Sequence, residues 1–407
     1  MSGVINTLLR FAPEWLLTLV DAMVQRDSFL LRWVKRHAAA GLAVPVPGRP
    51  DKDAQVRVFF GPFNYAGQAW RWSRSLEHAN AGINARNLTV TFPNDLGFES
   101  SDRVLAPVFV GSREWRRLQR DAFDAYTHVV IESFTSTLGM GRGRGLEAEI
   151  EWHQSQGRRV ALLCHGTDIR SPRAHSARSV HSPFLQMDRA DERLEKRARQ
   201  NQGVLDRFDG PVFFSTPDLV HDVPNGQWLP LVVDAEKWSR AGSAGGVAAG
   251  ERRIPAVLHA PTAPRIKGTA AVERAVHRLS DAIEYRALAG VPASQMPKHV
   301  AEADIVIDQL LLGSYGAAAC EAMAAGRAVV GNIDPEVRET VERACGLALP
   351  IIQADPDTIE EVLRRLAANR EEIRESAALG PAFVKAIHSG RRTLPVMNDF
   401  LGFERVR

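Results

Sequence analysis

The 407-residue chain has few cysteines, no long apolar segment and almost no net charge. Its cysteines, Cys164, Cys320 and Cys345, lie far apart and form no CxxC pair, which argues against a disulfide framework or a structural zinc module. No apolar run approaches the roughly 18–20 residues that cross a bilayer. The 51 basic and 48 acidic residues nearly balance, so the chain is not a general binder of polyanions. These absences favour a globular protein of a reducing compartment.

The composition that remains is that of a two-domain globular protein. Hydrophobic residues make up 45% of the chain and charged residues 24%, and single cores stop growing at about 250–300 residues. Only seven of the 51 basic residues are lysine. The others are arginine, whose forked guanidinium suits bidentate contacts to phosphate.

Residues 1–50 predict an amphipathic helical extension. The segment holds Trp15, Phe29 and Trp33, but charged residues interrupt every apolar stretch. One interpretation is that it packs on the rest of the protein. The other is a peripheral contact of residues 1–40 with the inner face of the membrane, because aromatic and arginine side chains suit that interface. We therefore expect a cytoplasmic protein, with membrane association as the open alternative.

After residue 50, short β-branched runs alternate with longer amphipathic segments. This alternation is typical of βαβ units and parallel sheets. Strands are predicted at 56–60, 88–92, 129–131, 160–164, 212–214, 256–259, 305–307 and 328–330, and helices at 66–79, 147–155, 190–205, 270–283, 317–325 and 359–368. The Gly/Ala/Ser-rich stretch 238–253 interrupts the pattern and predicts a linker. The fold class is therefore α/β, with two doubly wound domains at 51–237 and 254–385 and a tail, 386–407, expected to return to the first domain.

Small and polar residues follow two strands of the first domain, where ligands bind in such sheets. Gly61, Asn64 and Gly67 form a turn before a helix, which either offers backbone N–H groups to an anion or is simply a tight connection. A second strand runs into His165, with Asp168, Arg170 and Arg173 just beyond it. An imidazole at that edge can contact a substrate hydroxyl or move a proton, or it can merely satisfy the backbone.

The second domain has two comparable segments. Arg265 and Lys267 precede a helix, where the backbone already favours anions, and together they suit a diphosphate. The helix after the strand at 305–307 begins with small residues, so a ligand can approach its backbone closely. The residues concerned are Gly313, Ser314, Tyr315, Gly316 and Ala317. Glu321 lies about one turn further, and its carboxylate can accept two hydroxyls of a ribose.

These segments resemble the donor domain of the retaining glycosyltransferase family 4, which has the GT-B fold. The likeness rests on "KG" at 267–268 and on "EAMAAGRAVV" at 321–330, together with "HGTDIR" at 165–170 in the first domain. It covers roughly residues 56–386. The resemblance implies two facing Rossmann-like domains, with the acceptor on the first and a nucleoside-diphosphate sugar on the second. Asp168, Arg170 and Arg173 are then the candidates for contacts on the acceptor side.

The resemblance also implies a role for each residue. Lys267 would neutralise the donor diphosphate as it leaves, and Glu321 would hold the ribose. His165 would contact the donor sugar, while the turn at 61–67 and the backbone at 313–317 would meet the phosphates or sugar. The implied reaction is transfer of a hexose, with retention, to a hydroxyl of a glycan, lipid-linked or small acceptor in polysaccharide or glycoconjugate biosynthesis. Neither a metal nor a nucleic acid partner is expected.

Two positions depart from the family pattern. An acidic residue usually stands eight positions before the ribose glutamate, and here that position is Gly313. Asp308 and Gln309 are the candidates to replace its contact to the sugar. The usual phosphate-binding arginine stands five or six positions before the lysine, where this chain has Thr262 and Pro261. Arg265 is the candidate substitute.

Two other function classes stay open at this point. One is a nucleotide-sugar enzyme of the same architecture that does not transfer the sugar, such as an epimerase or a phosphorylase. The other, motivated by Gly313, is a non-catalytic or partner-dependent protein that binds a nucleotide sugar. Release of free nucleoside diphosphate only in the presence of an acceptor distinguishes a transferase from both.

Overall fold

The structure, a computed structural model, describes residues 39–92, 95–139, 145–244 and 247–403. Residues 1–38, which carry most of the predicted helical extension, lie outside these ranges, so both interpretations of that segment remain predictions. Within the described ranges no helix combines the length and the apolar character that crossing a bilayer requires.

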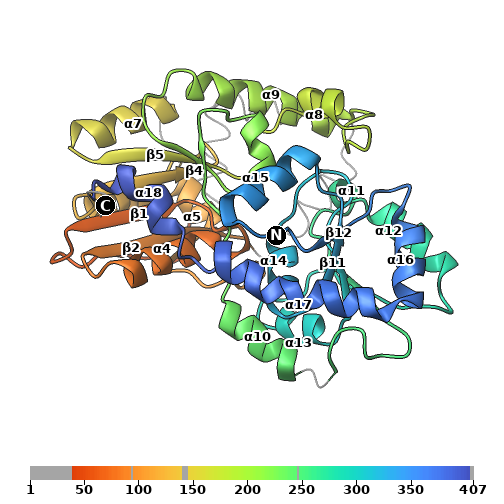
Figure 1. Ribbon diagram of the computed structural model, residues 1–407. Helices are drawn as coiled ribbons and strands as arrows, with labels where there is room; N and C mark the ends of the chain where they lie inside the picture. The colour runs from red at the N-terminus through yellow and green to blue at the C-terminus, as the bar shows by residue number, and fades with distance from the viewer. Residues whose placement is uncertain (1–38, 93–94, 140–144, 245–246, 404–407) are drawn as a thin grey trace.

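The first domain is a seven-stranded, fully parallel sheet between helices (Figure 1), with the strand order β3-β2-β1-β4-β5-β6-β7. Its central strands are nearly continuous apolar runs, because helices cover both faces of a parallel sheet. The strands are β1 (Val56–Gly61), β2 (Ile83–Thr91), β3 (Asp102–Leu105), β4 (His128–Glu132), β5 (Arg159–Cys164), β6 (Val212–Phe214) and β7 (Gln227–Trp228). The helices are η1 (Tyr65–Gly67), α4 (Gln68–Ala79), α5 (Ala106–Gly111), α6 (Arg113–Phe123), α7 (Leu146–Ser155), α8 (Pro172–Arg178), α9 (Arg189–Leu205) and η2 (Pro217–His221).

The second domain repeats this plan with five parallel strands in the order β12-β11-β10-β8-β9. The strands are β8 (Ala256–His259), β9 (Glu284–Ala287), β10 (Ile305–Ile307), β11 (Ala328–Gly331) and β12 (Ile351–Gln353). The helices are α11 (Pro264–Lys267), α12 (Thr269–Arg278), α13 (Met296–Ala301), α14 (Ala317–Ala324), α15 (Pro335–Cys345), α16 (Ile359–Ala368) and α17 (Arg370–Ile387). The prediction of two doubly wound α/β domains is confirmed.

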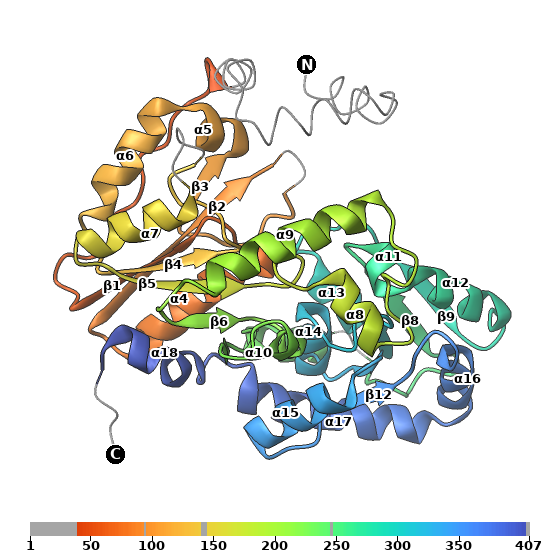
Figure 2. The ribbon, with the colours of Figure 1, turned by 90° about the horizontal axis from the view of Figure 1, so that it is seen from above.

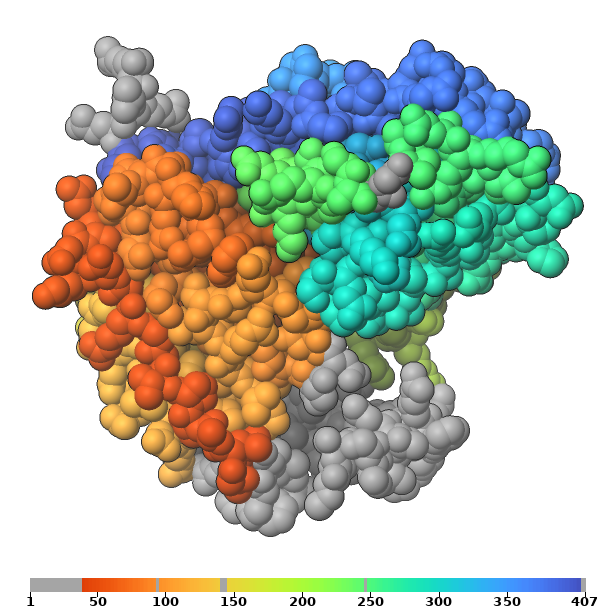
Figure 3. Space-filling model, turned by 90° about the horizontal axis from the view of Figure 1, so that it is seen from below, coloured from red at the N-terminus to blue at the C-terminus, as the bar shows by residue number. Residues whose placement is uncertain are grey.

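The segment 238–253 between the domains, predicted as a flexible linker, is partly helical. Helix α10 (Ala235–Ala244) occupies its first half, and Figure 3 shows this helix, in green, at the junction of the two domains. The side chain of Trp238 is buried, and Gly242 lies so close to the Ala325 carbonyl that a Cβ would approach it to 2.2 Å. The small residues that suggested flexibility therefore permit close packing instead.

The chain crosses between the domains a second time near its end. Helix α17 packs on α14 in the second domain, and α18 (Thr393–Leu401) then packs against α4 of the first. Figure 2 shows α18 beside the first sheet. The guanidinium of Arg159 donates to the Asp399 carbonyl (2.8 Å), and Phe400 meets His128 edge to face. Two crossings thus tie the domains together on one side.

Both sheets reverse their strand order at one point, and this determines where a ligand can bind. In the first sheet the reversal lies between β1 and β4, and in the second between β8 and β10. Crevices form at the carboxyl ends of strands that flank such a point. Contacts between segments that follow the strands cross from one domain to the other, for example from His175 on α8, after β5, to the Leu312 carbonyl after β10 (3.4 Å). The two carboxyl edges therefore face each other.

A buried histidine at the domain junction predicts loss of stability in mild acid. His388 donates through Nδ1 to the Leu231 carbonyl (2.8 Å), and its Nε2 lies 3.0 Å from the Tyr315 hydroxyl. Burial lowers its pKa from 6.5 to about 4. Because the unfolded chain takes up this proton and the folded protein resists it, the stabilisation is present above pH 6.5 and is lost as the pH falls towards 4. We expect a loss of about 2 kcal/mol between pH 7.5 and pH 5 from this group.

Urea denaturation at the two pH values measures this contribution. His388→Gln keeps a donor and an acceptor but does not titrate, so its loss of unfolding free energy should be smaller than that of the wild type. Burial also lowers the pKa values of His128 and His175 to about 4, and these groups titrate in both proteins. Equal losses in the variant and the wild type would contradict the prediction.

Candidate active site

His165, at the carboxyl end of β5, is held between two side chains from neighbouring strands. Its Nε2 lies 3.0 Å from Glu132 Oε1 at the end of β4, and its Nδ1 lies 3.2 Å from Ser215 Oγ beyond β6. Trp72 stacks on the imidazole at a centroid distance of 6.0 Å, and Tyr65 meets it edge-on at 4.9 Å. The ring orientation is thus fixed from four sides.

Glu132 is the partner that the sequence analysis did not identify. Its side chain is fully buried, and its second oxygen accepts from the Phe63 amide (3.1 Å). Burial raises the pKa of Glu132, while the hydrogen bond from His165 acts in the opposite direction. A carboxyl with a raised pKa in contact with an imidazole is a pair that can exchange a proton, a feature common at catalytic centres.

The backbone around this pair is strained. Among the described residues, only Ala66, Ser133 and Phe134 combine a side chain with a positive φ, at 51°, 50° and 53°. All three follow β1 or β4, the strands that flank the reversal of the first sheet. Such conformations are typically kept where function requires them.

The predicted turn after β1 leads into helix α4, and the side chain of Asn64 holds it in place. Asn64 Nδ2 donates to the Glu99 carbonyl (2.7 Å), and its Oδ1 accepts from the Trp70 amide (3.2 Å). Gly67 has a φ of 74°, and a Cβ there would press on Phe98 at 3.3 Å. Gly61 ends β1. The turn therefore lies at the reversal point, and the donor contacts of these three residues stay a prediction.

The three residues named as acceptor-side candidates are already bonded within the first domain. Asp168, buried, accepts from the His165 and Gly166 amides (3.1 and 2.6 Å from Oδ1) and so fixes the turn that carries His165. Arg170 is also buried and donates through Nε to Asp218 (3.0 Å). Arg173 is exposed and paired with Glu192 (2.7 Å). Asp168 and Arg170 thus stabilise the loop that carries His165. Contact of the three residues with an acceptor stays a prediction.

In the second domain, Lys267 and the start of α14 meet at the reversal point between β8 and β10. Lys267 closes α11, and its Nζ donates to Asp308 Oδ1 (2.6 Å). The Gly316 amide, at the N-terminus of α14, donates to Asp308 Oδ2 (2.7 Å). The predicted cation and the predicted backbone donor are therefore brought together, with a carboxylate between them.

The backbone geometry of the loop 313–317 accounts for glycine at position 313, where the family that the sequence resembles usually has an acidic residue. Gly313 has a φ of 67°, and a Cβ would lie 3.1 Å from that of Asp334, so an acidic side chain would be strained here. Asp308 and Gln309, the candidates to replace this acidic residue, make other contacts. Asp308 accepts from Lys267 and the Gly316 amide, and Gln309 donates to the Ser314 carbonyl (2.6 Å). Ser314 is buried, and Tyr315 directs its hydroxyl to His388 in the core. Within this loop, the Gly316 amide is bonded to Asp308, and contact of the loop backbone with a donor stays a prediction.

Glu321, predicted to bind ribose, pairs with a residue of the first domain. Arg71 Nη1, on α4, lies 3.6 Å from Glu321 Oε1, and both side chains are about nine-tenths buried. Burial raises the pKa of Glu321, opposed by Arg71. Arg71 also lines a cavity of about 920 Å³ formed by α4, α10, α17 and the crossing segment 232–234. The carboxylate predicted to bind ribose is therefore linked to the contact between the domains.

Arg265 spans the two domains instead of standing free beside Lys267. Its Nη1 lies 3.2 Å from Asp191 Oδ2 on α9 and donates to the Pro183 carbonyl (2.9 Å). Figure 2 shows α9 reaching across to α11. Asp191 is fully buried and belongs to the capping box of α9, so the guanidinium compensates a buried charge. A catalytic role for Arg265 stays a prediction.

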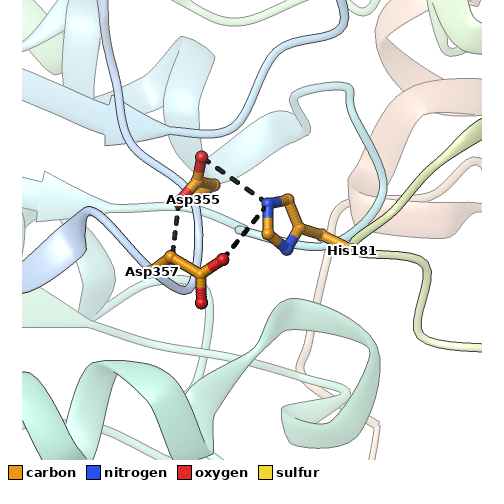
Figure 4. A group of neighbouring side chains, drawn as sticks. All are labelled: His181, Asp355 and Asp357. Atoms are coloured by element: carbon orange, nitrogen blue, oxygen red, sulfur yellow. Dashed lines mark hydrogen bonds and ion pairs between the residues drawn. The ribbon is translucent and has the colours of Figure 1, made fainter.

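Among the described residues, two clusters between the domains offer possible metal ligands. Figure 4 shows His181, from the loop after α8, directed at Asp355 and Asp357 before α16, with Nε2 to Oδ2 distances of 3.6 and 3.9 Å. The second cluster joins His221 to Asp334 and Glu336. In each, one carboxylate already accepts backbone amides at the start of a helix, Asp355 in the turn before α16 and Asp334 at the N-cap of α15. Helix capping and contacts between the domains account for both clusters.

Comparison with known proteins gives the fold but no close relative. No protein-family model matches the sequence, and the search of curated proteins found no match either. Among solved structures, a sucrose-phosphate synthase from Thermosynechococcus elongatus is 15% identical with a TM-score of 0.53, covering 85% of this chain and 98% of that one. An alpha-glucosyltransferase solved with UDP and DNA is 11% identical (TM-score 0.51, 88% and 100%). HepE from Anabaena, solved with UDP and glucose, is 13% identical (TM-score 0.51, 85% and 99%).

These likenesses extend over nearly the whole of each solved chain and over both α/β domains of this one. They agree with two parallel sheets of seven and five strands whose carboxyl edges face each other. At such low identity they establish architecture alone. The chain has the GT-B fold.

Proposed function

We propose that this protein is a glycosyltransferase that moves a sugar from a nucleoside-diphosphate donor to an acceptor hydroxyl. The observation that carries the proposal is the meeting of Lys267 and the first amides of α14 at the reversal point of the second sheet. A cation and a helix N-terminus together form a binding site for phosphate groups. Glu321 lies a little more than one turn along the same helix, where it can hold a ribose.

The first domain places an imidazole and a buried carboxyl group opposite the proposed donor site. His165 and Glu132 lie at the opposing carboxyl edge, where an imidazole can contact the donor sugar near the reacting carbon. The solved proteins with this fold include some whose structures contain UDP, or ADP with acarbose. By extension we propose a nucleotide-sugar donor, retention of configuration and a glycan, lipid-linked or small acceptor. Since Lys267 can neutralise the leaving diphosphate, the proposed reaction needs no metal.

The direct test incubates the full-length protein with a panel of nucleotide sugars, with and without a crude extract of acceptors. Release of nucleoside diphosphate only with acceptor, together with a product heavier by one sugar, supports transfer. Release without acceptor indicates hydrolysis or another reaction of the donor. Absence of release with every donor and extract would contradict the proposal.

A non-catalytic nucleotide-sugar-binding protein is the second candidate, and Gly313 favours it. An acidic side chain is absent from this position, and Asp308 and Gln309 are bonded elsewhere. A protein of this kind would bind the nucleotide but would show no turnover. Binding measured in parallel with the product assay distinguishes the two candidates.

Replacing Glu321 should remove most of the specific stabilisation by the nucleotide. The carboxylate can accept two hydrogen bonds from a ribose, and bonds to charged groups contribute about 1.5–3 kcal/mol each. We expect Glu321→Gln to weaken binding of the nucleoside diphosphate by about 10²-fold. Its thermal shift should then nearly vanish at a ligand concentration that stabilises the wild type by about 2.7 kcal/mol, which corresponds to 100 times Kd.

The matched control is Glu361→Gln on the outer face of α16, where the side chain is exposed. Its nucleotide-dependent shift should equal that of the wild type. An unchanged shift in Glu321→Gln would mean that the ribose is not held at this carboxylate.

A further inference from the structure

One buried carboxylate occupies both groups that the proposed donor diphosphate needs. Asp308 is 2% exposed. Its Oδ1 accepts from Lys267 Nζ (2.6 Å), and its Oδ2 accepts from the Gly316 amide (2.7 Å). Each oxygen thus takes one donor, as two oxygens of a phosphate would. In this structure the anchor for the diphosphate is already satisfied by an anion of the protein.

Two other basic residues of the described structure near this anchor, His259 and Arg265, are bonded elsewhere. His259, at the end of β8, uses Nδ1 on the Ile307 carbonyl and Nε2 on the Thr269 hydroxyl, both at 2.9 Å. Burial lowers the pKa of His259, so its ring is neutral near pH 7. Arg265 is bonded to Asp191 of the first domain. A diphosphate that approached Lys267 would therefore meet Asp308 as a like charge at short range, where repulsion is strong.

We propose that Asp308 is an internal counter-ion that holds the diphosphate anchor in the free protein and releases Lys267 and the Gly316 amide when the donor binds. This inference rests on the proposed function, because it takes Lys267 and α14 as the phosphate-binding groups. It assigns Asp308 a role other than contact to the sugar. Asp308 lowers the affinity for the donor and makes binding depend on displacement of its carboxylate.

Removal of the charge at position 308 should strengthen binding of anions. Asp308→Asn keeps the size of the side chain and an oxygen acceptor but leaves the charge of Lys267 uncompensated. We expect the Kd for inorganic pyrophosphate, and for whichever of UDP, GDP, ADP and dTDP binds, to fall about tenfold in calorimetric titrations of the full chain. In Lys267→Gln/Asp308→Asn this gain should disappear, because the cation that produced it is gone.

The matched control is Asp304→Asn at the other end of the same strand. Asp304 is also buried, and it accepts from the Gly250 and Ala256 amides (2.9 and 2.8 Å). This variant removes a buried carboxylate that directly precedes β10 and leaves Lys267 unchanged, so its Kd for pyrophosphate should equal that of the wild type. Circular dichroism and urea denaturation establish that each variant is folded.

The outcomes separate this inference from the proposed function. If folded Asp308→Asn binds pyrophosphate no more tightly than the wild type, or if no form binds it, the inference is wrong. Weaker binding in Asp308→Asn would mean that the carboxylate positions Lys267. If pyrophosphate binds more tightly to Asp308→Asn but no nucleoside diphosphate binds any form, the inference holds and the proposed function fails. If a nucleoside diphosphate binds wild type and Asp308→Asn equally well, the proposed function stands and the inference about Asp308 fails.

Discussion

Lys267→Gln is expected to lower kcat by about 10²–10³-fold. Negative charge develops on the diphosphate as the bond to the sugar breaks, and a preorganised donor at that place typically contributes this much. In the structure the Lys267 side chain is 17% exposed and lies at the reversal point of the second sheet. Kinetics of nucleoside diphosphate release with the identified donor and acceptor measure the effect.

The ion pair with Asp308 requires two controls for this experiment. Lys267→Gln leaves a buried carboxylate with only the Gly316 amide as a partner, and breaking a buried pair commonly destabilises a protein by about 3–5 kcal/mol. Lys267→Gln/Asp308→Asn should recover stability in urea without recovering kcat. Lys298→Gln, on the exposed side of α13, should behave as the wild type. A kcat within threefold of wild type in folded Lys267→Gln would exclude the proposed role.

The sequence predicted the inner part of each sheet and missed its outer part. The central strands are buried apolar runs, such as the fully buried β4 and β8, and their pattern is strong. The strands β3, β7, β9 and β12 have two to four residues each, and all include partly or fully exposed residues. Edge strands of this kind are short and polar because a long apolar edge promotes aggregation. Their local sequence therefore resembles that of loops.

In the candidate site, the sequence likewise predicted the residues marked by a local pattern and missed those placed only by the tertiary fold. His165 and Lys267 were identified because each follows a strand or begins a helix, and both positions are visible in the sequence. Glu132 is the last residue of β4 and His165 directly follows β5. The same rule applied to "VVIES" at 129–133 therefore identifies Glu132. Arg71 carries no such signal, because its contact with Glu321 joins residues 250 positions apart. Arg265 was assigned to phosphate for its proximity to Lys267 in sequence, whereas Asp191, 74 positions away, is its partner.

His165→Ala should reduce kcat by about 10²-fold or more, because proton transfer or hydrogen bonding by a positioned imidazole typically contributes 10²–10⁴-fold. The same variant leaves Glu132 fully buried without the imidazole that lies 3.0 Å from it. We therefore also expect a loss of stability of about 3–5 kcal/mol. Low activity in this variant alone would not distinguish a catalytic role from partial unfolding.

The double variant His165→Ala/Glu132→Gln separates these two effects. It removes the buried charge together with its partner, so unfolding free energy in urea should return most of the way to that of the wild type. Activity should remain as low as in His165→Ala, because the imidazole is still missing. Ser215→Ala, which removes only the hydroxyl 3.2 Å from Nδ1, should lower kcat by less than tenfold. If the double variant instead recovered activity along with stability, His165 would serve only to neutralise Glu132, and the chemistry would have to be carried by other groups at the facing edges.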